Sequence, residues 1–284
     1  NGKILAAYLG FEFVNAAEVI TFDTKGLLLL DETVNKIRKR LENVDAAVVP
    51  GFYGSTTEGI VKTFSRGGSD VTGSILANAV KADIYENWTD VSGFLVADPR
   101  VVENPDVINV ITYKELRELA YMGASVLHED AIFPVRTAGI PINIKNTNKP
   151  EDAGTMIVSD DHDFEDESNA YTITGIAGRK GFSTINIEKA MMNSEMGFGM
   201  KVLRVLADNN VSFEHMPSGI DTMSITVDTN SLNPVREKVL SQLRKEVNPD
   251  HLEIEDGIAL LAVVGRRMKN TRGTVARIFA SMAH

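Results

Sequence analysis

The sequence predicts an α/β fold followed by a ferredoxin-like βαββαβ unit. In the first half of the 284 residues, short apolar runs typical of buried strands alternate with helices of 3.6-residue periodicity. Residues 159–170 then form an acidic stretch with almost nothing to bury, and beyond it strands and helices follow in the order β-α-β-β-α. With 43% hydrophobic residues, the chain can fill the cores of about two domains.

Helices and strands alternate through the first half. Strands in such an order are parallel, and ligands of open α/β sheets bind at the carboxyl edge of the strands. Apolar spacing predicts helices over residues 4–9, 34–41 and 71–80, with strands over residues 18–22, 46–49 and 82–88.

The second half predicts a smaller unit. Its strands are expected over residues 183–188, 211–213, 223–227 and 257–264, and its helices over residues 198–206, 235–243 and 275–282. The chain is thereby divided into a first domain at residues 1–158, a solvated linker at residues 159–170 and a region at residues 171–284. That last region contains one βαββαβ unit and the incomplete beginning of a second.

Composition excludes several classes of protein. The net charge is −10 and no Lys/Arg block is present, so nucleic acid is not an expected partner. The absence of cysteine excludes disulfides, thiolate metal sites and a Cys nucleophile. The longest apolar run, residues 258–264, is far short of the roughly 20 residues that cross a bilayer, and the start does not have the pattern of a signal peptide. We expect a cytoplasmic protein with no membrane partner.

The most informative motif is the glycine-rich loop from Arg66 to Asp70. Gly67 and Gly68 let the backbone approach a ligand closely, and the helix expected near Asp70 points free N–H groups at that ligand. Arg66 adds a planar fork suited to a carboxylate or phosphate, and Ser69 adds a hydroxyl. The same residues also fit an ordinary turn in which Ser69 or Asp70 caps the helix. Spacing alone leaves the anion site and the capped turn equally open.

Two further stretches lie at expected strand ends. Residues 49–59 are rich in glycine, and residues 88–100 collect polar groups. The pair Asp98-Pro99 predicts a turn that presents Arg100. A nucleotide pocket could use these groups, and a surface turn explains them equally well.

Together these motifs resemble the aspartate kinase branch of the amino acid kinase family. The similar stretches are Gly51 to Gly54, the loop at residues 66–70, residues 89–93 and 98–100, and residues 123–128. The region after the linker resembles the paired ACT regulatory domains of those enzymes. The resemblance covers nearly the whole chain and implies a partial amino acid kinase (carbamate kinase-like) α/β sandwich followed by ACT domains.

The resemblance implies ATP-dependent phosphorylation of the side-chain carboxylate of L-aspartate to 4-phospho-L-aspartate, with Mg²⁺, as the first step of lysine, threonine and methionine biosynthesis. In such a site Arg66 faces the α-carboxylate of aspartate and Asp70 its ammonium. The residues implied to hold aspartate are Phe52, Arg66, Gly67, Gly68, Ser69 and Asp70. Those implied to hold ATP are Thr89, Asp90, Leu95, Arg100, Ser125 and Val126, and no protein metal site is implied.

The chemistry agrees with these roles. A carboxylate with an unperturbed pKa near 3.9 is already ionised at neutral pH, so the attack needs no general base. The difficulty is to bring two anions together, and catalysis then depends on alignment and cationic contacts. His128 is interpreted as a structural histidine.

The sequence departs from the family at several positions. The family's Lys-Phe-Gly-Gly motif and the acidic segment after it have no counterpart, and we expect both to lie before Asn1. The 284 residues alone are therefore predicted to be inactive. Leu95 stands where members often have tyrosine, Ser125 where many have lysine, and Ser65 where glycine is usual.

The regulatory half is implied to bind a pathway end product and to form a homodimer through its ACT domains. Lysine is expected rather than threonine, because Glu214 could meet a ligand ammonium. The side chains of Met192 and Phe198 fit a hydrophobic core better than a ligand site. The candidate effector contacts are Met192, Gly197, Phe198, Ser212, Phe213 and Glu214.

Two other functions remain open from the sequence. A related kinase acting on glutamate, acetylglutamate or a nucleotide would share the ATP edge but should lack the ACT pair and the loop at residues 66–70. A non-catalytic amino-acid sensor would use the kinase part only as a scaffold.

Overall fold

The computed structural model describes residues 1–65, 67–123, 129–162, 172–266, 268 and 270–283, which form two compact units. The first unit comprises Asn1–Ala177 and Ala262–His284, and the second comprises Gly178–Leu261. Arg66, Ser125, Val126, His128 and most of the expected linker lie outside the described residues. Every helix in the described part of the chain is too short or too polar to span a bilayer.

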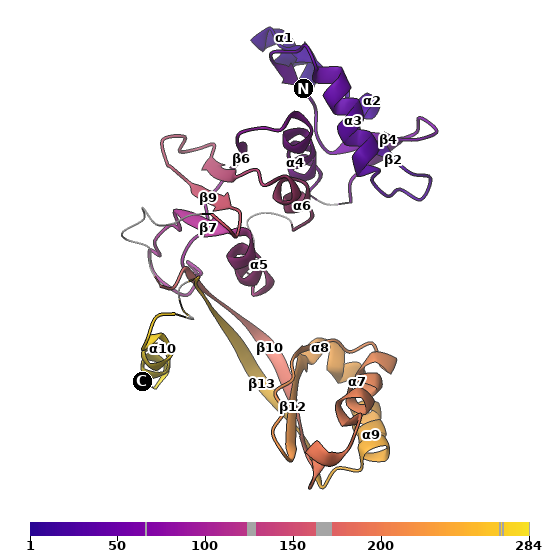
Figure 1. Ribbon diagram of the computed structural model, residues 1–284, viewed down its shortest axis with the longest axis vertical. Coiled ribbons are helices and arrows are strands. Elements are labelled where there is room, and N and C mark those ends of the chain that lie inside the picture. Colours follow the sequence, from indigo (N-terminus) through magenta and orange to yellow (C-terminus); the bar gives the residue numbers. More distant parts are fainter. Residues whose placement is uncertain (66, 124–128, 163–171, 267, 269, 284) are drawn as a thin grey trace. The chain divides into compact units, whose positions relative to one another are not determined.

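The described part of the first unit builds its sheets from short strands (Figure 1). The strand β1 (Glu12–Phe13) pairs with β3 (Ala47–Val48), and a second sheet has the order β2 (Thr21–Phe22), β4 (Tyr53–Thr56), β5 (Val61–Thr63). The third sheet has the order β6 (Tyr85–Thr89), β8 (Ile142–Asn146), β9 (Thr155–Val158), β7 (Val110–Thr112). The helices are α1 (Gly2–Leu9), α2 (Ala16–Val19), α3 (Leu30–Leu41), α4 (Gly68–Val80), α5 (Tyr113–Tyr121), α6 (Glu129–Ala138) and α10 (Thr274–Met282).

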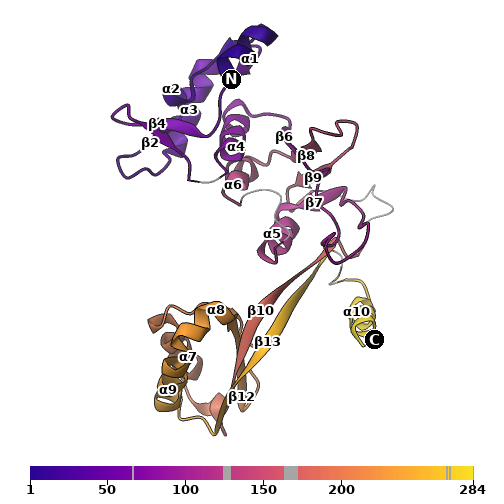
Figure 2. The same ribbon diagram turned by 180° about the vertical axis from the view of Figure 1, so that it is seen from behind.

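Helix α4 lies at the centre of this unit, beside α6 and α3 in both ribbon views (Figures 1 and 2). Its stripe of apolar residues buries Ile75 and Ala79, which share one core with Ile37 of α3 and Val135 of α6. A helix fixed by packing on two sides presents its first turn in a defined place.

The parallel strands β6 and β8 end side by side at one edge of the third sheet. Thr89 and Asn146 are register partners at the carboxyl ends of the two strands. The amide of Thr147 donates to the Thr89 carbonyl at 2.9 Å, which joins the two loops as they leave the sheet. This is the kind of edge at which α/β sheets bind ligands.

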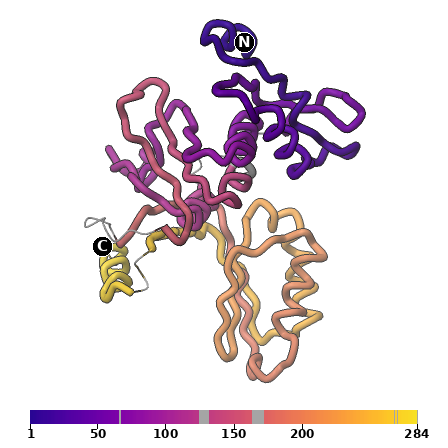
Figure 3. The backbone as a smooth tube through the Cα atoms, turned by 45° about the horizontal axis from the view of Figure 1, so that its top comes forward, coloured from indigo at the N-terminus to yellow at the C-terminus, as the bar shows by residue number. Residues whose placement is uncertain are grey.

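The second unit is a ferredoxin-like sandwich, as predicted. The strands β10 (Gly175–Glu188), β11 (Phe213–His215), β12 (Thr222–Asp228) and β13 (His251–Val264) form a sheet of order β11-β12-β10-β13, while α7 (Phe198–Asp208) and α9 (Arg236–Val247) cover one face of it (Figure 3). The short elements η1 (Met192–Ser194), α8 (Thr229–Leu232) and η2 (Asn233–Val235) complete the connections. The buried residues include Ile185, Ile187, Val202, Leu206, Ile225, Val239 and Leu243.

Two predicted strands were misplaced. Residues 18–22 were expected as one strand, but Ala16–Val19 is the helical turn α2, because the Asn15 side chain accepts a hydrogen bond from the Ala17 amide and caps it. The strand expected at residues 211–213 lies instead at Phe213–His215. The predicted boundaries at residues 158 and 171 stay predictions.

Candidate functional site

The two glycine-rich loops meet at the start of α4. A Cβ atom on Gly51 would lie 3.1 Å from the Cα of Ser69, and one on Gly68 would lie 2.8 Å from Cδ2 of Phe52. Phe52 has a positive φ of 83°, and its amide donates to Oγ1 of Thr72 at 3.2 Å. Because side chains at these glycines would collide with the facing loop, the residue type there is dictated by close backbone approach.

Helix α4 begins without a side-chain cap. Its N-cap is Gly67, with a φ of 58° and no capping hydrogen bond from a side chain. Ser69 is exposed and Asp70 is half-buried, and neither makes the capping bond that the turn interpretation required. Among the described residues no side chain caps this helix start, which leaves its N–H groups available to a ligand, and the anion site stays a prediction.

Asp70 is held by strand β6. Nδ2 of Asn87 donates to Oδ1 of Asp70 at 3.1 Å and to the hydroxyl oxygen of Tyr85 at 3.0 Å, and that hydroxyl donates to the Asp70 carbonyl at 3.2 Å. Burial raises the pKa of Tyr85 and the Asp70 charge adds to the increase, while the Asn87 hydrogen bond opposes it. Sequence reasoning missed Asn87 and Tyr85; the available signal was an asparagine at an inward position of an alternating strand.

The same strand links Asp70 to the expected nucleotide residues. Asn87 and Thr89 are two residues apart in β6, so their side chains point to the same face of the sheet. Thr89 donates to Oδ1 of Asp90 at 3.3 Å. The structure thus places the first turn of α4 and the end of β6 along one face.

The loop after β6 is pinned to the sheet edge. Ser92 donates to Oδ2 of Asp152 at 2.5 Å and accepts from Nδ2 of Asn146 at 2.8 Å. The Phe94 amide donates to Oγ1 of Thr155 at 2.8 Å, and Phe94 is buried. These contacts hold the backbone of the edge at which the sequence predicts nucleotide binding.

Leu95 and Arg100, both expected to hold ATP, lie in different surroundings. Leu95 is half-buried and forms an isolated bridge with Val107. The Arg100 guanidinium forks onto Asp98, with Nε 3.0 Å from Oδ1 and the nearer Nη 2.7 Å from Oδ2, and its side chain is 84% exposed. These hydrogen bonds hold the pKa of Asp98 below its usual value. Any phosphate contact by Arg100 would compete with this carboxylate.

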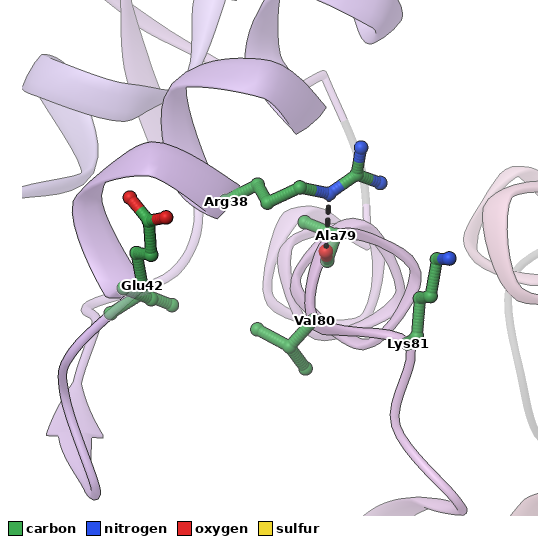
Figure 4. A pocket seen from close by; sticks show the side chains of 6 residues that line it. Arg38, Glu42, Ala79, Val80 and Lys81 are labelled. Carbon is green, nitrogen blue, oxygen red and sulfur yellow. Dashed lines mark hydrogen bonds between the residues drawn. The ribbon is translucent and has the colours of Figure 1, made fainter.

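A separate pocket of about 420 Å³ lies at the other end of α4 (Figure 4). Nε of Arg38 donates to the Ala79 carbonyl at 3.4 Å across it. It shares no residue with the two glycine-rich loops, so we assign it no part in the site. Its lining residues are Arg38, Leu41, Glu42, Ala79, Val80 and Lys81.

In the second unit, the candidate effector residues fall into two groups: Met192, Gly197 and Phe198 lie at or before the start of α7, while Ser212, Phe213 and Glu214 lie at β11, level with Ser183 of β10 in the sheet register. The N-cap of α7 is Gly197, with a φ of 78° and no side-chain cap. Met192 and Phe198 are buried in the core, as their apolar character indicated, and only their backbones could face a ligand. Ser212 and Phe213 are exposed, with Phe213 on the edge strand β11.

The charged groups near the two sets of effector residues are already paired. Glu214 lies where the register of β11 shifts, and Oε1 is 3.8 Å from an Nη atom of Arg179. Glu195, which was not predicted, accepts from Nζ of Lys189 at 2.5 Å and from Nζ of Lys201 at 2.6 Å. The two lysines hold the pKa of Glu195 below its usual value. A charged ligand at either place would exchange partners with these groups.

Comparison with known proteins identifies the class. The model of the amino acid kinase family matches residues 2–146. The chain belongs to this family, and the predicted α/β kinase fold is confirmed.

Within the family, the chain is similar to aspartokinases. It is 40% identical to aspartokinase 3 of Bacillus subtilis over 286 aligned residues, which cover 98% of this chain and 62% of that protein. It superposes on the crystal structure of Clostridium acetobutylicum aspartate kinase with a TM-score of 0.88 and 55% identity, covering 100% of this chain and 64% of that one. Aspartokinase III of Escherichia coli, solved with lysine and aspartate, gives a TM-score of 0.65 at 26% identity over 90% of this chain and 57% of that one. The chain thus spans less than two-thirds of the length of these proteins.

Proposed function

We propose that this chain is part of an aspartate kinase, which transfers the γ-phosphoryl group of ATP to the side-chain carboxylate of L-aspartate. The observation that carries the proposal is the uncapped start of α4, joined through Asp70 and Asn87 to the end of β6. Similarity to aspartokinases over nearly the whole chain favours this reaction over the related kinases and over a non-catalytic sensor.

The chain's own residues would orient the two anionic reactants. The free N–H groups at the start of α4 suit a carboxylate, and Arg66 would add its fork. Asp70 would face the substrate ammonium while Asn87 fixes the orientation of its carboxyl group. An oxygen of the substrate carboxylate forms a bond to the γ-phosphorus as the bond from that phosphorus to the β-γ bridging oxygen breaks. The products are 4-phospho-L-aspartate and ADP.

ATP would lie along the edge formed by Thr89, Asp90 and the pinned loop at residues 92–98. The loop's backbone is fixed before the nucleotide arrives, which reduces the ordering cost of binding. Leu95, Arg100, Ser125 and Val126 complete the proposed contacts.

Mg²⁺ fits as an ion carried by the nucleotide. The described residues bring together no group of three or more His, Cys, Asp or Glu side chains that could hold a metal. Mg²⁺ commonly binds through substrate phosphates and water with one or two carboxylates, and it would neutralise phosphate charge here.

The second unit is proposed to bind lysine and to form a homodimer. An effector carboxylate could meet free N–H groups beyond Gly197, and an effector ammonium could displace Arg179 from Glu214. The strand register puts these places towards opposite ends of the part of β10 that pairs with β12, so they are separate candidate contacts. The crystal structure of E. coli aspartokinase III in complex with lysine and aspartate supports this choice of effector. The edge strand β11, with Phe213 exposed on it, offers an open strand for a second copy. Sedimentation equilibrium would test the dimer, and calorimetry with lysine against threonine would test the effector.

The activity itself is tested by trapping aspartyl phosphate as its hydroxamate. We expect activity from a chain in which the first part of B. subtilis aspartokinase 3 precedes these residues, and none from the 284 residues alone. Arg66→Ala should reduce kcat/KM for aspartate by at least about a hundredfold, because the loss of a charge-assisted bidentate contact costs about 3 kcal/mol or more. Phosphorylation of glutamate in place of aspartate would contradict the proposal.

A further inference from the structure

A buried carboxylate, Glu115 on helix α5, joins parts of the first unit that lie far apart in the sequence. Its side chain is only 7% exposed. Oε2 accepts from the amide of Thr112 at 2.9 Å and from its hydroxyl at 3.0 Å, and the Thr112 hydroxyl oxygen accepts from the Glu115 amide at 3.2 Å. These bonds form a capping box at the start of α5.

The other carboxylate oxygen, Oε1, makes hydrogen bonds that are not part of the capping box. Oε1 accepts from the hydroxyl of Thr174 at 2.5 Å and from Nε of Arg266 at 3.3 Å. Thr174 immediately precedes β10, and Arg266 follows the end of β13. These are the two strands by which the chain enters and leaves the second unit. One carboxylate therefore contacts both strand ends where they lie in the first unit.

The neighbouring contacts bind the same ends further. The amide of Thr174 donates to the Val264 carbonyl at 2.7 Å, and an Nη atom of Arg266 donates to the Val110 carbonyl at 2.9 Å. The amide of Ile176 donates to the carbonyl of Val96 at 2.7 Å, and Val96 belongs to the loop that follows β6. The start of β10 is thus connected to the proposed nucleotide edge as well as to α5.

The charge of Glu115 is maintained although it is buried. Burial alone would raise its pKa, but the hydrogen bonds from Thr174 and the Thr112 amide and the charge of Arg266 outweigh burial and hold the pKa below the ordinary value. Removing the charge of Glu115 would leave its buried partners without their acceptor, which is costly. Loss of this charge should therefore loosen all the groups that the carboxylate contacts.

We propose that Glu115 is a positioning residue that makes helix α5 and the two strand ends at residues 174–177 and 262–266 open and close as one unit. One consequence rests on the proposed function. In an aspartate kinase, a ligand that shifts β10 or β13 would thereby also act on the loop at Val96 and on α5. Contiguous networks of packed and hydrogen-bonded groups of this kind can carry coupling between sites.

The test is hydrogen exchange by mass spectrometry on the 284-residue chain, with no ligand or activity required. Glu115→Gln retains the capping box, because glutamine serves at that position, but it loses the charge that holds Arg266. We expect exchange to rise about tenfold or more at residues 113–121, 174–177 and 262–266 together, with β12 unchanged. The control Glu118→Gln, at an exposed position of the same helix, should leave all of them at wild-type rates.

Two further variants separate the contacts of Glu115 with Thr174 and Arg266 from its role in the helix cap. Thr112→Val removes the cap hydroxyl and should raise exchange only in the first turn of α5. Arg266→Met, useful if Glu115→Gln fails to fold, should loosen residues 174–177, because the Glu115 carboxylate bridges the Arg266 side chain to the Thr174 hydroxyl. Strand ends that keep wild-type rates in Glu115→Gln and Arg266→Met, or that open equally in Thr112→Val, would show that Glu115 only caps α5. Failure of the kinase assay would leave this result unaffected.

Discussion

Helices α4 and α7 begin in the same way but in different surroundings. Each has a glycine N-cap with a positive φ, Gly67 at 58° and Gly197 at 78°, and neither has a side-chain cap. At α4 two loops press on the backbone, and Asp70 is held by neutral groups. At α7 the first residue, Phe198, is buried, and Glu195 nearby is neutralised by two lysines.

The difference indicates two kinds of ligand site. The start of α4 is closely packed, because the facing loop leaves little room for a Cβ at Gly51 or Gly68, and close packing suits the alignment of reactants. The start of α7 is bordered by ion pairs that a ligand can exchange, which suits reversible binding of a charged effector.

The largest effect should come from adding a methyl group at the start of α4, compared with the matched change in α7. Gly68→Ala would place a Cβ within 3.0 Å of three atoms of Phe52 and Phe64, and we expect it to destabilise the first unit by about 3 kcal/mol. Urea unfolding followed by the fluorescence of Trp88, the single tryptophan, measures this loss. The matched change Gly199→Ala in α7 meets only Met223 at 3.7 Å and should be neutral or stabilising. Equal losses from the two changes would remove the distinction.

A smaller effect should follow from replacing strand asparagines. Asn87→Leu leaves Oδ1 of Asp70 and the Tyr85 hydroxyl without their donor, and we expect a loss of about 2 kcal/mol in the free energy of unfolding. Asn186→Leu in β10 breaks a half-exposed bond from Ser224 and should cost about 1 kcal/mol or less. The two losses are compared by denaturant titration monitored by circular dichroism. The reverse order would argue against a structured network at Asp70.

The ion pairs before α7 should give a pH dependence. Because the pKa of Glu195 is lowered in the folded protein, its contribution to stability is present above the ordinary glutamate pKa and is lost as pH falls through the lowered value. Thermal unfolding of wild type and Glu195→Gln should therefore differ at pH 7 and converge under acid conditions. A difference that persists or grows at acid pH would show that Glu195 acts by some means other than its charge.

The smallest effect is expected at the surface pair Asp98 and Arg100. Asp98→Asn should leave the free energy of unfolding nearly unchanged, because exposed ion pairs contribute little. The same variant frees the Arg100 fork and should not weaken nucleotide binding. Calorimetry with ADP that showed a large loss of affinity would mean that Asp98 itself contacts the ligand.

Much of the fold could be predicted because its helices carry strong apolar stripes. Helices α4 and α7 were found from residues such as Ile75 and Val202 that bury one face. The glycine loop was also visible as a motif, although its spacing fitted an anion site and a capped turn equally well. The turn α2 was missed because a single asparagine cap overrode an alternating pattern.

The rest depends on contacts between distant residues. Asn87 meets Asp70 across 17 residues, and Glu115 meets Arg266 across 151, so no local pattern announces either pair. The pairing of Arg100 with Asp98 was within reach of the sequence, because the two are separated by one proline. That the guanidinium binds both carboxylate oxygens could be seen only from the geometry of the turn.

The central claim is that the nucleotide edge lies in the first unit, at the end of β6. Hydrogen exchange of the 284-residue chain with and without MgADP tests it directly. We predict slower exchange at residues 87–98, with no change across residues 178–261. Unchanged exchange at residues 87–98, or protection confined to the second unit, would contradict it.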